Sequence, residues 1–171
     1  MELTDTTLLN FSHSIPDRCR NERDTILKTG LGKWDTYVRK NFAVALEKWF
    51  LHDFGTKPEY KKYVYIEGHN TIPINHRGHS FFGTTMHPDA AIIDGERRLV
   101  AIELDHGTKG SQIRNALAKA GFSVKLGGFE QAIVLFFIDS IKLSHKLERQ
   151  KNEENILRLY QEQFNTTLYI L

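Results

Sequence analysis

Three acidic residues, Asp89, Glu103 and Asp105, stand in the part of the sequence with the clearest strand pattern. The stretch 89–105 is typical of two apolar strands joined by a tight turn at Asp94-Gly95. Carboxylates that cluster raise one another's proton affinity unless a cation lies between them. Oxygen ligands favour Mg²⁺, Mn²⁺ or Ca²⁺ over zinc, and such an ion would activate water beside a phosphate. The residue types therefore indicate metal-dependent hydrolysis of a phosphodiester bond.

The alternation of side chains along a strand decides which of these acids share a face. Glu103 and Asp105 are two residues apart, so they project from the same face. Antiparallel pairing about Asp94-Gly95 joins residues whose numbers sum to about 190, which places Asp89 opposite Ala101 and diagonal to Glu103. We therefore expect the three carboxylates to share one ion.

The rest of the pattern supplies the elements that would hold this hairpin. Apolar stripes at helical spacing predict one helix over 35–55 and another over 111–125. A helix between the hairpin and the next strand implies a parallel crossover. The sequence thus predicts an α/β fold with a mixed sheet flanked by helices. Further strands are expected at 63–66, 131–139 and 166–171, and a charge-rich helix at 143–163.

Length and composition bound the organisation of the chain. Its 171 residues, 40% of them hydrophobic, suit one domain with a lead-in of little core at 1–34, a core at 35–139 and a final helix and strand at 140–171. The single Cys19 excludes an intramolecular disulfide and a cysteine zinc site. The longest apolar run, 132–138, has seven residues, whereas a membrane-spanning helix needs about 20. No secretory signal is readable, so we expect a cytoplasmic protein that does not enter a membrane.

Pro88-Asp89, an interval of 13 residues and the triplet Glu103-Leu104-Asp105 resemble the motif of the PD-(D/E)xK nuclease superfamily. The resemblance extends over 35–139, where the expected order of elements matches the restriction-endonuclease-like α-β-β-β-α-β core. It implies that Asp89 and Glu103 bind Mg²⁺ or Mn²⁺ and that the substrate is DNA. Asp105 stands where the family has a lysine, and we expect it to assist as a third metal ligand.

Two further residues complete the catalytic site that this resemblance implies. Because Asp105 replaces the water-orienting lysine, another lysine must take that role. Lys109 is our candidate, since a loop just past Gly107 would fold its amine over the strand ends, while Lys119 lies more than two helical turns further on. Glu47 matches the acid that family members place near the metal from the first helix. It lies off the apolar stripe of that helix.

A shorter run, Glu103-Leu104-Asp105-His106-Gly107-Thr108, is similar to a pattern in nuclease-like replication-relaxation proteins of plasmids and other mobile elements. This similarity implies mobile-element DNA as the partner. The competing interpretation of the acidic residues is a solubilised strand end. The alternative function is then a non-catalytic DNA-binding module of a replication or mobile-element system.

A net charge of +2 is too small to indicate nucleic-acid binding by itself, so any positive charge that binds DNA must be local. The polar loop 68–87 is long enough to enter a DNA groove. Because each site handles one phosphodiester, cutting both strands suggests a homodimer. Six residues are expected to contact DNA: Lys40, His79, His106, Gln112, Arg114 and Lys119.

Overall fold

The structure, a computed structural model, describes residues 3–28, 34–55, 57–68, 79–81, 84–107, 109–138 and 151–171, and only the backbone of 34–37, 79–81, 84–86 and 151–152. Its helices are α1 (Asp5–Asn21), α2 (Arg23–Ile26), α3 (Trp34–Phe54), α4 (Lys57–Tyr63), α5 (Gly110–Lys125) and α7 (Lys151–Phe164). Its strands are β1 (Val64–Ile66), β2 (His79–Phe81), β3 (Thr84–Met86), β4 (Ala90–Asp94), β5 (Arg97–Gly107), β6 (Gln131–Ile138) and β7 (Thr166–Ile170).

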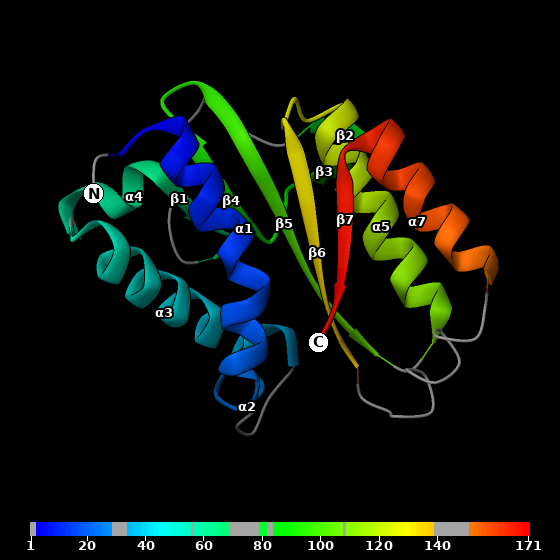
Figure 1. Cartoon of the computed structure of the whole chain (residues 1–171), viewed down its shortest axis with the longest axis horizontal. Helices are drawn as coiled ribbons and strands as arrows, with labels where there is room; N and C mark the ends of the chain where they lie inside the picture. The colour runs from blue at the N-terminus through cyan, green and yellow to red at the C-terminus, as the bar shows by residue number, and fades with distance from the viewer. Residues whose placement is uncertain are drawn as a thin grey trace.

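Five of these strands form one mixed sheet in the order β1-β4-β5-β6-β7 (Figure 1). β1, β4 and β5 pair antiparallel, whereas β5, β6 and β7 pair parallel. α5 connects β5 to β6 and α7 precedes β7, so a helix lies in the connection of each parallel step. The predicted α/β class with a mixed sheet is therefore confirmed.

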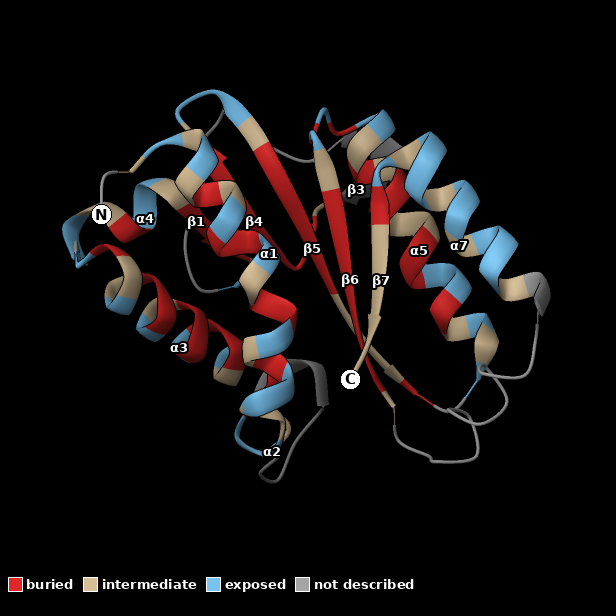
Figure 2. Ribbon diagram, viewed as in Figure 1, coloured by how far each residue is buried: buried red, intermediate tan, exposed pale blue. Residues whose placement is uncertain are grey.

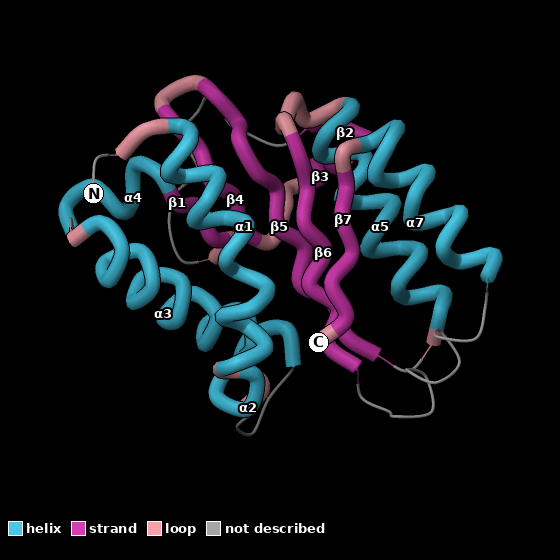
Figure 3. Tube along the Cα trace, in the orientation of Figure 1, coloured by secondary structure: helices cyan, strands magenta, loops and turns pink. Residues whose placement is uncertain are grey.

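Helices pack on both faces of the sheet and bury two apolar cores (Figure 3). On one face, Phe42 and Phe50 of α3 are fully buried in the core that α1 also joins. On the other face, Ile113 and Leu117 of α5 pack with Ala101 of β5. Figure 2 shows the buried residues along the central strands and on the helix surfaces turned toward them.

The first helix belongs to the core, so the expectation that 1–34 is a lead-in with little core is wrong. Leu8, Phe11, Ile15 and Cys19 are buried in the same core as α3. Their spacing of three, four and four residues is that of one helical face. The polar residues between them conceal this stripe in the sequence.

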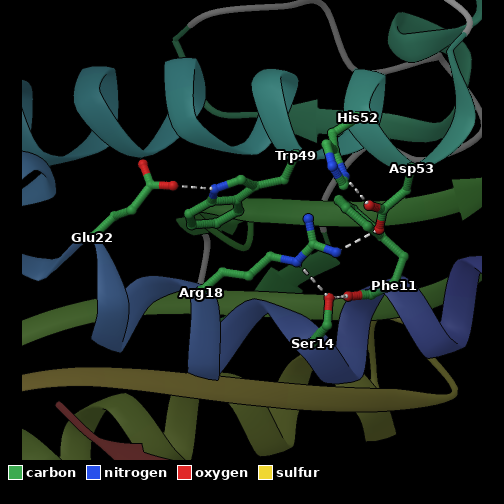
Figure 4. Close-up of polar contacts among 7 residues, drawn as sticks. All are labelled: Phe11, Ser14, Arg18, Glu22, Trp49, His52 and Asp53. Atoms are coloured by element: carbon green, nitrogen blue, oxygen red, sulfur yellow. Dashed lines mark hydrogen bonds and ion pairs between the residues drawn. The ribbon is translucent and has the colours of Figure 1, made fainter.

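Polar contacts also join α1 to α3 (Figure 4). Arg18 Nη2 lies 2.6 Å from Asp53 Oδ2, and the two side chains are 26% and 14% exposed. Arg18 Nε donates a hydrogen bond to Ser14 Oγ at 2.9 Å, which fixes the guanidinium. Trp49 Nε1 donates to Glu22 Oε1 at 2.9 Å, and this hydrogen bond lowers the pKa of Glu22. These contacts hold α3, which carries a residue of the candidate site.

Two predicted segments are described only in part. Within the loop expected at 68–87, β2 and β3 pair as a separate antiparallel ribbon, while 69–78 and 82–83 lie outside the described residues. The helix expected at 143–163 corresponds to α7, and its portion before Lys151 also lies outside them. In the described part of the chain, no helix is long and apolar enough to cross a membrane.

Candidate active site

The loop of the β4–β5 hairpin lies one residue further along the chain than the sequence predicts. Asp94 pairs with Arg97, so the loop is Gly95-Glu96 and the expected turn at Asp94-Gly95 is wrong. Gly95 has a φ of 57°, a left-handed value that glycine adopts at the first position of a two-residue hairpin loop. An irregularity just before Ile93 shifts the register by one more residue. Both changes move the acidic residues relative to each other.

This register places Asp89 directly opposite Glu103 instead of diagonal to it. Ala90 pairs with Ile102, so the ladder continued by one residue joins Asp89 to Glu103. Directly opposed residues of an antiparallel pair have Cβ atoms about 4.5–5.5 Å apart. The two carboxylates therefore lie side by side on the face that α5 covers, and Asp105 shares that face.

Asp89 is only 4% exposed and is held from two sides. Its Oδ2 accepts a hydrogen bond from the backbone N–H of Leu104 at 2.8 Å, and its Oδ1 lies 3.0 Å from Nη2 of Arg39 in α3. The same guanidinium contacts Glu67 at the end of β1, with Nη1 3.0 Å from Oε2. Arg39 thus bridges two carboxylates.

Glu103 is 1% exposed and forms an ion pair with Lys119 of α5, whose Nζ lies 2.6 Å from Oε2. Apart from this ion pair, Oε2 has no hydrogen bond of regular geometry within the described residues. Burial raises the pKa of Glu103 to about 8, and the adjacent Asp89 raises it as well, while Lys119 opposes both effects. Glu103 consequently binds a proton more readily than an ordinary glutamate.

Lys119 is the second cation of this cluster, beside Arg39. Burial by itself lowers its pKa, but the neighbouring charges of Glu103, Asp89 and Asp105 outweigh burial and raise the pKa above its usual value. The side chain is 44% exposed, so the ammonium group lies at the border between the acids and solvent. Lys119 therefore stays charged at neutral pH and faces the acidic pair.

Asp105 lies at the edge of the cluster and is half-buried. Its Oδ1 accepts a hydrogen bond from the backbone N–H of His106 at 2.7 Å. Burial raises the pKa of Asp105, and the charge of Lys119 lowers it. Asp105 thus interacts with the charge of Lys119, but its hydrogen bond is to the backbone of its own strand, β5.

The oxygens of Asp89 and Glu103 could hold a hard divalent ion between β4 and β5. Magnesium is usually bound through one or two carboxylates together with substrate phosphates and water, so this pair fits it. No group of three histidine, cysteine or acidic side chains among the described residues lies close enough to hold a metal ion. A cage of three carboxylates that includes Asp105, as expected from the sequence, is therefore not formed in the structure.

Two predicted catalytic residues, Lys109 and Glu47, contact other parts of the molecule. Lys109 is exposed at the start of α5, where its backbone N–H donates to Gln112 Oε1 at 3.1 Å, so the geometry favours Lys119 for the lysine role. Glu47 lies two helical turns beyond Arg39 along α3, with its carboxylate 4.0 Å from Lys57 Nζ.

The other residues that we expect to contact DNA differ in how exposed they are. Lys40 is exposed on α3 next to the residue that binds Asp89, and Arg114 is exposed on the α7 side of α5. The side-chain amide of Gln112 packs on Gly107, whose φ of 148° is a backbone conformation that other residues rarely adopt. His106 is half-buried beside Asp105. His79 pairs through its backbone in β2, and its side chain lies outside the described part.

Sequence reasoning missed the role of two residues at the site. In the sequence Arg39 is one of several basic residues in the stretch 28–40, and Glu67 directly follows the strand expected at 63–66. The position of Glu67 directly after β1 is the available sequence signal. Because β1 pairs with β4, the backbone N–H of Glu67 donates a hydrogen bond to the carbonyl of Asp89 at 2.9 Å. The contact of Arg39 depends on how α3 packs, which no local pattern indicates.

A pocket of about 290 Å³ lies elsewhere, between α5, α7 and β7, and none of its lining residues is one of the three carboxylates. The chemistry of the site therefore rests on the carboxylate pair itself. Comparison with protein-family models, with curated proteins and with solved structures finds no match to this chain.

Proposed function

We propose that this protein is a metal-dependent DNA endonuclease that hydrolyses phosphodiester bonds on a restriction-endonuclease-like core. The observation that carries the proposal is the direct opposition of two buried carboxylates, Asp89 and Glu103, with Lys119 on the second of them. The order of α3, β1, β4, β5, α5 and β6, with α4 and the β2–β3 ribbon as additional elements between them, supports the same core, because it agrees with the α-β-β-β-α-β order of that superfamily.

Each residue of the site has a separate role in this proposal. Asp89 and Glu103 would hold Mg²⁺ or Mn²⁺, which supplies activated water and neutralises charge that develops on the phosphate. Lys119 directs its ammonium group to the same place and orients the attacking water. Arg39 keeps Asp89 in position through its bond to Oδ1. Asp105 adds negative charge that keeps Lys119 protonated.

DNA is the proposed substrate because the motif resembles those of DNA nucleases and because cations border the acids. Arg39 is 30% exposed and Lys119 is 44% exposed, so both reach solvent beside the carboxylates. Cations in these positions contact phosphates without reading sequence. The resulting binding would fall steeply as salt concentration rises.

The second candidate function is a non-catalytic DNA-binding module, and one observation favours it. Each carboxylate of the pair already has a basic partner: Arg39 on Asp89 and Lys119 on Glu103. When both acids are ionised, these basic partners compensate their buried charges without any metal ion. A core of this kind would keep its fold and bind DNA without turnover.

A cleavage assay tests the proposal. Supercoiled, single-stranded and branched DNAs are incubated with the protein and Mg²⁺ or Mn²⁺, in parallel with Asp89→Asn, Glu103→Gln and the control Glu96→Gln, an exposed acid of the hairpin loop. We expect cleavage by the wild type and by Glu96→Gln only. Equal cleavage by Asp89→Asn would refute the assignment. DNA binding without cleavage and without Mn²⁺ uptake would favour the non-catalytic module.

A further inference from the structure

The outer edge of β7 carries backbone groups that the sheet does not use. Asn165 accepts a hydrogen bond from β6 through its carbonyl, and Leu171 both donates to and accepts from that strand. Because parallel pairing uses every second residue, 165, 167, 169 and 171 face β6. The N–H and C=O groups of Leu168 and Ile170 therefore point away from the sheet. Within the described part of the chain, no strand pairs with this side of β7.

Within the residues that the structure describes, the outer edge of β7 carries none of the features that usually prevent an open sheet edge from pairing. Native proteins keep exposed edges from pairing by making them short or by placing charges, prolines or bulges on them. The opposite edge, β1, has only three residues and lies between Lys62 and Glu67. β7 instead has five residues, Thr-Thr-Leu-Tyr-Ile, with no charge and no proline. Figure 2 shows it half-buried along most of its length.

Apolar side chains surround the same edge. Leu168 and Ile170 of β7 line the 290 Å³ pocket together with Ile156 and Leu157 of α7. Ile156 is 43% exposed and Leu159, one turn further along α7, is 52% exposed. Exposed apolar surface next to an open strand edge is typical of an interaction surface. Backbone groups and apolar side chains thus mark one contiguous region.

We infer that β7 is a dimerisation edge at which a second copy of this chain pairs antiparallel about a two-fold axis through Tyr169. In this register Leu168 of one copy lies opposite Ile170 of the other. The four outward backbone groups of Leu168 and Ile170 in each copy then find partners, and four hydrogen bonds join the two strands. The nearly fully buried Thr166 is not needed for this pairing.

We assign a second copy of this chain to the edge. In the proposed register each strand presents to its partner the same residues that the partner presents to it, so both copies make identical contacts. The two sheets of five strands join into one continuous sheet without introducing a charge at the junction. The two Tyr169 residues form a cross-strand aromatic pair, and Leu168 packs beside Ile170. The symmetry also brings the two α7 helices, with their exposed Ile156 and Leu159, onto the same face. This inference does not rest on the proposed nuclease activity.

A cysteine cross-link tests the axis. Tyr169→Cys places two thiols at a non-hydrogen-bonded pair, where the Cα atoms of the two copies lie about 4.5 Å apart. This distance is within the range of a disulfide. Mild oxidation should give a covalent dimer on a non-reducing gel. Val44→Cys, at an exposed position on α3, is the control and should stay monomeric, and the native Cys19 is buried. Absence of the Tyr169→Cys cross-link in a folded variant would overturn the inference.

Mass measurement in solution provides a second test that does not disturb the strand. Light scattering of the whole chain should give twice the 19.8 kDa of one chain. The surface variant Ile156→Glu with Leu159→Glu should give 19.8 kDa, while Val44→Glu should keep the double mass. A wild type that is monomeric at every concentration, or a dimer that the α7 variant leaves intact, would each refute pairing at β7.

Discussion

Because the pKa of Glu103 is raised, we predict that the free energy of unfolding in the absence of divalent ions depends on pH through this residue. Burial raises the pKa of Glu103 to about 8 in the folded protein, whereas the unfolded chain has the ordinary value of 4.5. A group with a raised pKa in the folded state stabilises it fully at pH values below 4.5, and this contribution is lost as pH rises toward 8. Replacing Glu103 by Gln removes the titration and keeps the shape of the side chain.

The size of the effect follows from the two pKa values. Each pH unit between them changes the free energy of unfolding by about 1.4 kcal/mol for one proton. Between pH 5 and pH 8, Glu103→Gln should therefore gain about 3 to 4 kcal/mol relative to the wild type. The gain should fall once Mg²⁺ is added at pH 8, because an ion that binds only the folded wild type stabilises it.

Urea unfolding followed by tryptophan fluorescence, to which the buried Trp49 contributes, measures these free energies at pH 5, 6, 7 and 8. Glu96→Gln, at an exposed loop position, is the matched control and should run parallel to the wild type. If the curves of Glu103→Gln and the wild type also run parallel over this range, Glu103 does not hold an extra proton, and the account of the cluster is refuted.

Three further variants test the ion pairs. Lys119→Met should lower the rate of DNA cleavage about 100-fold, as expected for loss of one preorganised donor, and Lys119→Arg should retain more activity; equal rates for both would exclude the lysine role. Arg39→Gln should weaken Mn²⁺ binding about 10-fold in calorimetry, because the residue orients Asp89, and an unchanged affinity would remove that role. Asp53→Ala should cost about 1 to 2 kcal/mol in urea unfolding, since its pair with Arg18 is mostly buried; a loss within about 0.2 kcal/mol would refute this.

The sequence was sufficient to predict the elements that carry the candidate site. Alternation in 97–105 correctly places Glu103 and Asp105 on one face, and the helix predicted over 111–125 corresponds to α5. These predictions succeed because side-chain periodicity is local and depends little on the rest of the chain. The strand expected at 166–171 is likewise found as β7.

Local sequence patterns could not predict the pairing register of β4 and β5 or the contacts between residues far apart in the chain. Asp94-Gly95 is a strong turn signal, yet the chain places Gly95 first in the loop and adds an irregularity before Ile93. A change of one or two residues in pairing decides whether Asp89 lies diagonal to Glu103 or opposite it. Such a choice depends on how the two strands pack against the rest of the sheet.

The structure brings Lys119 instead of Lys109 into contact with Glu103 for a related reason. Lys109 is close to the acids in sequence, but it stands at the exposed start of α5, where it precedes the first turn of the helix. Lys119 is more than two turns further on, and α5 runs back over the face of β5, so its ammonium group reaches Glu103. Proximity along the chain is a poor guide once a helix reverses direction over a sheet.

The most direct test of the central claim is a crystal soaked with Mn²⁺ and examined by anomalous scattering. We expect one strong peak between the carboxylates of Asp89 and Glu103, with the ammonium group of Lys119 moved away from Glu103 Oε2. A peak at another place, or none at the pair while DNA is still cleaved, would contradict it.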